Sequence, residues 1–310
     1  MTDSVLSTGE QLESIWHLGG LTPRQLAKRV WAGINENNIF GRASELAYSF
    51  LLAIFPGLLF LVALFGLFAS EASGLQSRLF YYLATVLPPV AYQVVFKTVH
   101  DIARNASGGK LTIGIVLGLW TASGGMASMI SALNGAYGVR DHRSYFKVRA
   151  VAIAQTVAIS VLTISALIII IAGGHLASFL AHHLGWSEVW VVLWDVVQWP
   201  IALFFLFLAY ALVYYFGLDL HEQHWYWITP GSLLGVLLWI AASFVLRIYI
   251  HFFNTYSTTY GSLGAVIILL LWFYVTGLTF LIGAEVNAEI EHAAARHGHP
   301  EAKPEGKKAA

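Results

Sequence analysis

The sequence contains no cysteine among its 310 residues, which excludes a disulfide scaffold, a thiol nucleophile and a thiolate zinc site. Charged residues are also scarce, at 11% of the chain, whereas soluble domains carry about 25%. Apolar residues make up 57%, and the mean hydropathy is +0.67. A soluble protein needs a larger fraction of charged residues to cover its surface. The composition therefore predicts an integral membrane protein, with the lipid bilayer as a partner.

The little charge that is present is balanced and dispersed. Lys and Arg together number 17, as do Asp and Glu, and no five like charges follow one another, so we expect no nucleic-acid partner. The first twenty residues contain Asp and Glu but no Lys or Arg, from which we expect no cleavable signal peptide.

The histidines do not form a metal-binding or catalytic pattern. His221 and His224 lie three apart without an HExxH spacing, and His182–His183 is expected in a short exterior loop. We therefore expect no enzyme (a ribonuclease included), no metal site and no cofactor.

Six stretches are long and apolar enough to cross the hydrocarbon core, which takes about 20 residues in a helix. The predicted fold class is all-α, a polytopic membrane helical bundle of six transmembrane helices with an N-terminal interfacial helix and short exterior helices. Pro56 and Pro200 are expected to break the first and fourth spans. The helices are expected near residues 45–68, 111–138, 149–172, 190–216, 228–252 and 261–288.

Basic residues indicate the orientation, because Lys and Arg are retained in the cytoplasm. Twelve of the seventeen fall in the N-terminal segment, in the connection between the second and third spans and in the C-terminal tail, which six spans place on one side. Both termini are therefore predicted to be cytoplasmic. The predicted domains are a polar N-terminal segment (1–22), a six-span membrane domain (23–291) and a disordered cytoplasmic tail (292–310).

Two further segments have an organisation of their own. Residues 23–38 place their apolar side chains on one helical face, which is typical of a helix that lies on the cytoplasmic leaflet. Residues 79–96 are uncharged but contain Pro88–Pro89, and neither half is long enough to cross. They form either a re-entrant pair or two short helices on the exterior surface. The exterior arrangement is favoured, because lipid cannot satisfy the backbone groups that a proline pair leaves open.

The second span carries small residues at spacings of three and four along one helical face. One interpretation is a close-packed helix interface, in which small side chains let two backbones approach. The other is the polar lining of a solute path, to which Ser123, Asn134 and Tyr137 would contribute. Both can hold at different depths. The members of this small-residue seam are Thr121, Gly124, Ser128, Ser131, Gly135 and Gly138.

Charges near the exterior ends of the spans need partners or solvent, because a charge in hydrocarbon is costly. Asp195 and Arg247 lie at similar depths in the fourth and fifth spans. Our hypothesis is that they form an ion pair, and the alternative is that each is exposed separately at the interface. Residues 254–264, before the sixth span, are rich in hydroxyl groups and are expected to form an ordered exterior loop.

Carboxylates mark the opposite, cytoplasmic ends of the spans. Glu45 shares a helical face with Ser49, and Glu285 shares one with Glu289, each pair four residues apart. These acids are either caps and interface anchors, with Arg42 as the partner of Glu45, or a cation or proton site in a cavity that opens to the cytoplasm. The full set of transport or ion-coupling candidates is Glu45, Ser49, Ser128, Asn134, Tyr260, Glu285 and Asn287.

A resemblance to a known family rests on three segments: LAYSFLLAIFPGLLFLVALFGLF (46–68), GLWTASGGMASMISALNGAYGV (118–139) and YGSLGAVIILLLWFYVTGLTFLIGAEVNAEIE (260–291). Their order and spacing are similar to those of the YihY/BrkB family of bacterial inner-membrane proteins, over roughly residues 25–291. The resemblance implies a multi-pass protein of the cell inner membrane, with links to virulence, to the envelope and to proposed transport of small solutes or lipids. The family's older ribonuclease BN label is regarded as mistaken, and no catalytic residues carry over.

Two functions fit these features. The first is a secondary transporter or flippase-like protein for a small solute or lipid. Because the sequence has no phosphate loop for a nucleotide, a coupling cation or the substrate gradient itself would drive it. The second is a non-transporting membrane scaffold in envelope biogenesis, which small-residue faces serve equally well. Those faces also leave a homo-oligomer open, and the sequence does not name a substrate.

Overall fold

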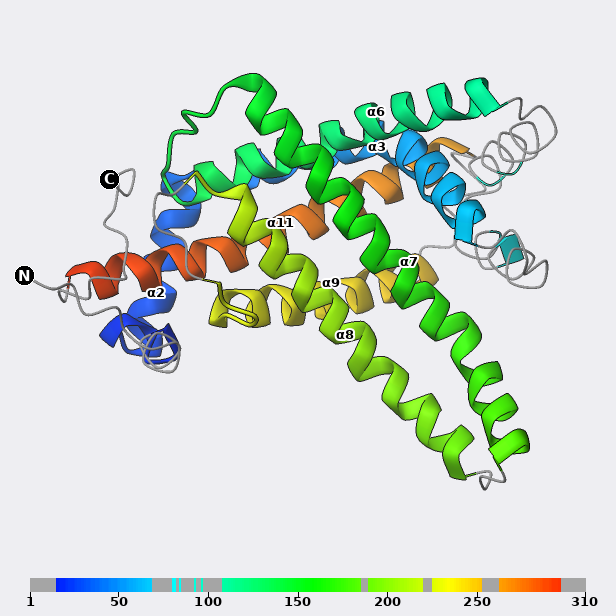
Figure 1. Cartoon of the computed structure of the whole chain (residues 1–310). Coiled ribbons are helices and arrows are strands. Elements are labelled where there is room, and N and C mark those ends of the chain that lie inside the picture. The colour runs from blue at the N-terminus through cyan, green and yellow to red at the C-terminus, as the bar shows by residue number, and fades with distance from the viewer. Residues whose placement is uncertain are drawn as a thin grey trace, which may run out of the picture. The chain divides into compact units, whose positions relative to one another are not determined.

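The computed structural model describes residues 15–68, 80, 81, 84, 92, 96, 108–184, 189–219, 225–252 and 262–296, with only the backbone given at some helical positions. All regular structure in these residues is helical (Figure 1), which confirms the all-α fold class. The elements are η1 (Leu18–Gly20), α2 (Pro23–Glu36), α3 (Ile39–Phe68), α6 (Gly108–Ala136), α7 (Tyr145–Leu184), α8 (Val189–Gly217), α9 (Pro230–Phe252) and α11 (Ser262–Arg296).

Five of the described helices are long and apolar enough to cross a membrane, namely α6, α7, α8, α9 and α11. They overlap the second to sixth predicted spans in order. α3 covers the first predicted span. For most residues in the second half of this helix, the structure describes the backbone only. The helices together fit a multi-pass membrane protein.

α7 extends further than predicted. It runs to Leu184 rather than to residue 172, so His182 and His183 lie in a helix and the prediction of an exterior loop there is wrong. The glycine pair at 173–174 does not end the helix, because apolar surroundings penalise unsatisfied backbone groups and favour continued helical hydrogen bonding.

α11 also extends further, to Arg296. The tail predicted from residue 292 is therefore helical at its start, and its remainder lies outside the described residues. The physical reason is packing against η1. A Cβ on Gly19 would collide with the carbonyl oxygen of Ile290 and crowd the amide nitrogen of Ala294. This contact covers the last turns of α11 and removes the exposure expected of a disordered tail.

The two prolines do not break their helices. Pro56 lies inside α3 and Pro200 inside α8, and both helices continue past them, so the predicted interruptions are wrong. A proline removes one backbone hydrogen bond and disturbs one turn. Membrane helices tolerate this where neighbouring groups satisfy the freed carbonyl.

The chain divides into two compact units. Unit 1 contains residues 1–51, 125–152 and 210–310, and unit 2 contains residues 52–124 and 153–209. The whole of η1, α2, α9 and α11 belongs to unit 1, whereas α3, α6, α7 and α8 each contribute one end to it. The contacts that build the candidate site all lie within unit 1.

α2 begins at a capping motif that the sequence provides. The Gln25 N–H donates to Oγ1 of Thr22 at 3.3 Å, and the Thr22 N–H donates to Oε1 of Gln25 at 2.9 Å. Pro23 occupies the first turn, where its missing N–H costs nothing. This capping box confirms the helix predicted over residues 23–38, while its place on a membrane surface stays a prediction. Its buried face packs against α11.

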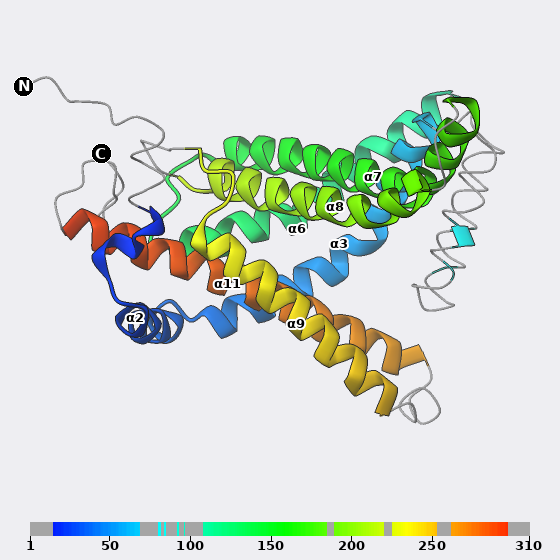
Figure 2. The same ribbon diagram turned by 90° about the horizontal axis from the view of Figure 1, so that it is seen from below.

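α9 and α11 lie side by side (Figures 1 and 2) and approach closely at Gly231 and Gly283. A Cβ built on either glycine would collide with the carbonyl oxygen of the other. The missing side chains therefore set the distance between the two helices, as at other close helix crossings in membrane proteins.

We expect Gly231→Ala to lower the free energy of unfolding by about 1–3 kcal/mol, the usual cost of overpacking a filled interior, because its methyl group would meet the Gly283 carbonyl. Thermal unfolding of the purified protein in detergent measures the change. Gly57→Ala is the matched control, since the nearest atom to its Cβ would be Cβ of Ala122 at 3.8 Å, an ordinary contact. Equal melting temperatures for the two variants would contradict the close approach.

Candidate functional site

A buried carboxylate lies where α2 packs against α11. Glu285 is 1% exposed, and a Cβ on Gly33 of α2 would collide with its Oε1. Nδ2 of Asn37 donates to both carboxylate oxygens, at 3.2 and 3.1 Å. Within the described ranges no Lys, Arg or His forms an ion pair with this group. The carboxylate thus occupies the space of a missing side chain and is held by a neutral amide.

Asn37 connects this carboxylate to two other helices at the turn between α2 and α3. Its Nδ2 also donates to the carbonyl oxygen of Ala136, the last residue of α6, at 3.2 Å. Its own carbonyl accepts from Nε of Arg42, on α3, at 2.8 Å. Asn38 completes the turn with a φ of 50°, a left-handed conformation that asparagine tolerates. One residue therefore links Glu285, the end of α6 and Arg42.

Asn287 caps the start of α9. It is 4% exposed, its Oδ1 accepts from the N–H of Gly231 at 2.9 Å, and its Nδ2 donates to Oγ1 of Thr229 at 2.9 Å. Thr229 and Ser232 exchange a further pair of hydrogen bonds, at 2.9 and 3.0 Å. Because the first N–H groups of a helix lack partners inside the helix, these contacts are those of a cap assembled across α9 and α11.

Asn134 of α6 has a similar place at the end of α8. It is 2% exposed, and its Nδ2 donates to the carbonyl oxygens of Ile130 and Gly217 at 2.8 and 2.9 Å. Its Oδ1 accepts from the N–H of Asp219 at 2.9 Å. Backbone groups therefore engage both ends of the amide, which ties α6 to the C-terminus of α8.

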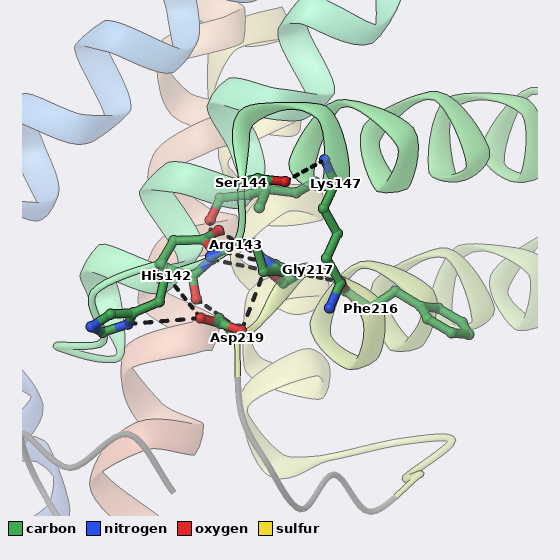
Figure 3. A network of polar contacts seen from close by, with 10 residues as sticks. His142, Arg143, Ser144, Lys147, Phe216, Gly217 and Asp219 are labelled. Carbon is green, nitrogen blue, oxygen red and sulfur yellow. Dashed lines mark hydrogen bonds and ion pairs between the residues drawn. The ribbon is translucent and has the colours of Figure 1, made fainter. Parts of the chain in front are cut away.

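Arg143 reaches the same helix end from the connection between α6 and α7 (Figure 3). It donates to the carbonyl oxygens of Gly217 at 2.6 Å and Phe216 at 3.2 Å. The carboxylate of Asp141 accepts from its Nε at 3.0 Å and from its Nη2 at 2.7 Å, and an oxygen of Asp219 lies 3.9 Å from Nε. A cation is favoured at a helix C-terminus, and here two carboxylates also compensate its charge.

The charge state of Asp141 follows from this contact. Burial by itself raises the pKa of the Asp141 carboxyl. The hydrogen bonds from the side chain and the backbone N–H of Arg143, together with the positive charge of the guanidinium, outweigh burial and hold the pKa below its usual value. The carboxylate is therefore charged at neutral pH, and the pair is fully formed there.

A cavity of about 330 Å³ lies beside this network. Its volume is within the range of small-ligand pockets, roughly 300–1,000 Å³. The guanidinium of Arg42 lies against Gly135 in its wall, where a Cβ would collide with it. The polar and small lining residues are Arg42, Ser131, Asn134, Gly135, Asp141 and Arg143, with two valines.

The other predicted pair, Glu45 and Ser49, is placed differently from Glu285. Glu45 is exposed, and Ser49 is partly buried. Arg42 turns toward the carbonyl of Asn37, and no ion pair joins it to Glu45 among the described contacts, so the predicted partnership is not formed. The reason is geometric, since the Asn37 carbonyl lies within reach at the helix start.

The members of the small-residue seam differ in exposure. Of its members, Thr121 and Ser131 are exposed and Gly124, Ser128 and Gly135 are partly buried. Gly138 terminates α6 instead, with a φ of 64°, and the N–H of Val139 donates to the carbonyl of Asn134 at 2.9 Å. This is the glycine pattern of a helix C-terminus. No described atom lies within 4 Å of a Cβ built on Gly138, so Gly138 is not a packing residue.

The hypothesis of an Asp195–Arg247 ion pair stays a prediction. The side chain of Asp195 lies outside the described residues, and Arg247 is exposed. Tyr260 and most of residues 79–96 also lie outside the description. The choice between a re-entrant pair and exterior helices therefore stays open.

Sequence reasoning did not single out Asn37 or the cluster of Asp141, Arg143 and Asp219. The available signal was positional, because each lies in a short polar connection between apolar helices. Such a residue is either solvated or caps a helix end. The contacts that decide between these roles join residues 73 or more positions apart, and no local pattern reveals them.

Comparisons with known proteins agree with the membrane helices. A family model described as virulence factor BrkB matches residues 30–307. YfkH of Bacillus subtilis (strain 168), named as a ribonuclease-like protein, is 30% identical over 247 residues, which is 80% of this chain and 88% of the relative. The UPF0761 membrane protein azo3165 of Azoarcus sp. (strain BH72) is 26% identical over 252 residues, and the match spans 59% of its length. No solved structure matches the chain.

We expect Asp141→Asn to lower the melting temperature at pH 7, with a difference from wild type that shrinks as the pH falls below about 4. The folded-state pKa lies below the unfolded value, so the carboxylate stabilises the fold above its unfolded pKa and loses this effect as the pH falls through the folded pKa. Melting temperatures between pH 7 and 3 in one detergent measure it. Glu45→Gln, at an exposed position of α3, is the control. A deficit in Asp141→Asn that stays constant over this range would overturn the assignment.

Proposed function

Because the chain belongs to the virulence factor BrkB family of membrane proteins, we propose that it is a secondary transporter or flippase-like protein for a small solute or lipid, with Glu285 as its ion-coupling residue. The observation that carries this proposal is the buried carboxylate. It lies in a helix apolar enough to cross a membrane, and its hydrogen-bond donor is a neutral amide.

A buried carboxylate needs neutralisation. The hydrogen bonds from Asn37 stabilise its oxygens but bring no positive charge, and the carboxylates of Glu289 and Glu36 add negative potential. An unpaired charge away from water is expensive, and ionisable residues inside membrane segments commonly bind or relay ions. A proton or a metal cation taken up by Glu285 meets this requirement, and its release would couple an ion gradient to a change of structure.

Asn37 provides the route by which that change would leave the carboxylate. It donates to Glu285 and to the end of α6, and it accepts from Arg42 in the cavity wall. Neutralising the carboxylate weakens the hydrogen bonds that it accepts, since bonds to a charged acceptor are roughly twice as strong as neutral ones. The turn between α2 and α3 would then be free to move. In the orientation proposed from the basic residues, this end of unit 1 faces the cytoplasm of a bacterial inner membrane.

We expect Glu285→Gln to reduce gradient-driven flux in proteoliposomes by about tenfold or more, because a glutamine is isosteric but binds neither a proton nor a cation. Two probes are used, a radiolabelled betaine for solute uptake and a fluorescent phosphatidylethanolamine for lipid movement, each with and without a proton or sodium gradient. Glu45→Gln is the matched control, because it makes the same chemical change at an exposed position of α3.

The outcomes separate the parts of the proposal. Equal gradient-driven flux in wild type and Glu285→Gln would remove Glu285 as the coupling residue. Lipid movement that ignores both gradients would favour a flippase-like role without ion coupling. An absence of flux for both probes, in protein that retains its melting temperature, would count against transport and favour a scaffold.

A further inference from the structure

One guanidinium in the cavity wall has no counter-charge among the described residues. Arg42 donates through Nε to the carbonyl of Asn37 at 2.8 Å, and no carboxylate of the described chain lies within ion-pair distance of it. Its terminal nitrogens lie against Gly135, in the wall of the cavity. Arg42 therefore presents a positive charge and its terminal N–H donors to a cavity that is partly open to its surroundings.

The other charges of the cavity compensate one another. Arg143 is engaged by Asp141, by Asp219 and by two backbone carbonyls. The amide hydrogens of Asn134 are directed to two carbonyl oxygens. The charged groups that line the space are the guanidinium groups of Arg42 and Arg143 and the carboxylate of Asp141, whereas Asp219 is not among the lining residues, so the lining has one positive charge in excess. The hydroxyl of Ser131, which also lines the space, is a further donor. Arg42 lies in the first turns of α3, where the helix dipole adds positive potential.

We propose that this cavity binds a phosphate group, held by the two terminal nitrogens of Arg42 and by the Ser131 hydroxyl. A guanidinium matches the geometry of a phosphate through paired N–H donors, and a volume of about 330 Å³ holds a phosphate with a small organic body attached. The phosphate is either free or part of a lipid headgroup. This site does not depend on transport, because it is defined by binding and would exist in a scaffold as well.

The first test is equilibrium binding of inorganic phosphate to the full chain in detergent, by calorimetry, with ionic strength held constant by potassium chloride. Wild type is expected to bind, and Arg42→Gln to bind at least about tenfold more weakly, as loss of a charged hydrogen-bond pair predicts. Arg140→Gln is the matched control. It removes the same charge from an exposed position just after α6 and is expected to bind as wild type does.

A second variant keeps every charge and moves only the guanidinium. In Gly135→Ala the new methyl group would collide with the end of the Arg42 side chain, which is flexible and can swing away at little cost to folding. Phosphate binding is expected to weaken here too, with the melting temperature in the absence of phosphate close to that of wild type. If Arg42→Gln does not fold, Gly135→Ala decides the question.

A third arm identifies the source of the phosphate. The protein is placed in nanodiscs of phosphatidylcholine with or without phosphatidylglycerol, and its melting temperature and phosphate binding are measured. Competition between phosphatidylglycerol and inorganic phosphate in wild type, absent in Gly135→Ala, assigns the site to a lipid headgroup. Phosphate binding without such competition assigns it to a soluble ligand. No binding of either, or equal loss in Arg140→Gln and Arg42→Gln, overturns the proposal.

Discussion

Asparagine side chains that bridge helix ends hold unit 1 together. Backbone groups at helix ends have no partners within their own helix, and a membrane leaves little water to satisfy them. Asn134 supplies what the end of α8 lacks, Asn287 does so for the start of α9, and Asn37 does so for the end of α6. Each of these side-chain amides lies on one helix or turn and forms a hydrogen bond with a backbone group at the end of another helix. The arrangement of helices in this unit therefore depends on satisfying ends, in addition to packing apolar faces.

The buried Glu285 and the partly buried Asp141 differ in the charge of their partners. Asp141 meets a guanidinium that also caps α8, so its charge is compensated and its role is structural. Glu285 meets only the amide of Asn37 within the described ranges. Both acids lie near helix junctions, and their position alone does not distinguish them. The partner distinguishes them. A guanidinium neutralises the carboxylate permanently, whereas an amide leaves the negative charge to be neutralised by a proton or a cation that can dissociate.

Hydropathy was sufficient to predict the helices, because a span of apolar residues has few alternatives in lipid. The apolar face of residues 23–38 likewise predicted α2, and the capping box at Thr22 defines its start in the structure. Local pattern failed where the outcome depended on distant contacts. The end of α11 is stabilised by η1, which the sequence places some 270 positions earlier. Gly138 fits the spacing of a packing seam, yet it ends α6 with a positive φ. No neighbouring residue in the sequence explains why position 33 is a glycine. The side chain that occupies the space beside it is that of Glu285.

Asn37 connects the proposed ion site to the proposed phosphate site, and this connection has a thermodynamic consequence. Asn37 binds Glu285 through its side chain and Arg42 through its carbonyl. A ligand that draws Arg42 into the cavity acts on the same turn as a proton or cation that neutralises Glu285. If occupancy of one site changes the position of this turn, it changes the affinity of the other, and the coupling is equal in both directions. A coupled transporter requires such a coupling between its ion site and its ligand site, whereas a scaffold does not. Asn37 contributes no charge to either proposed site. Its role would be to couple them, and this coupling is what distinguishes a transporter from a protein that only binds.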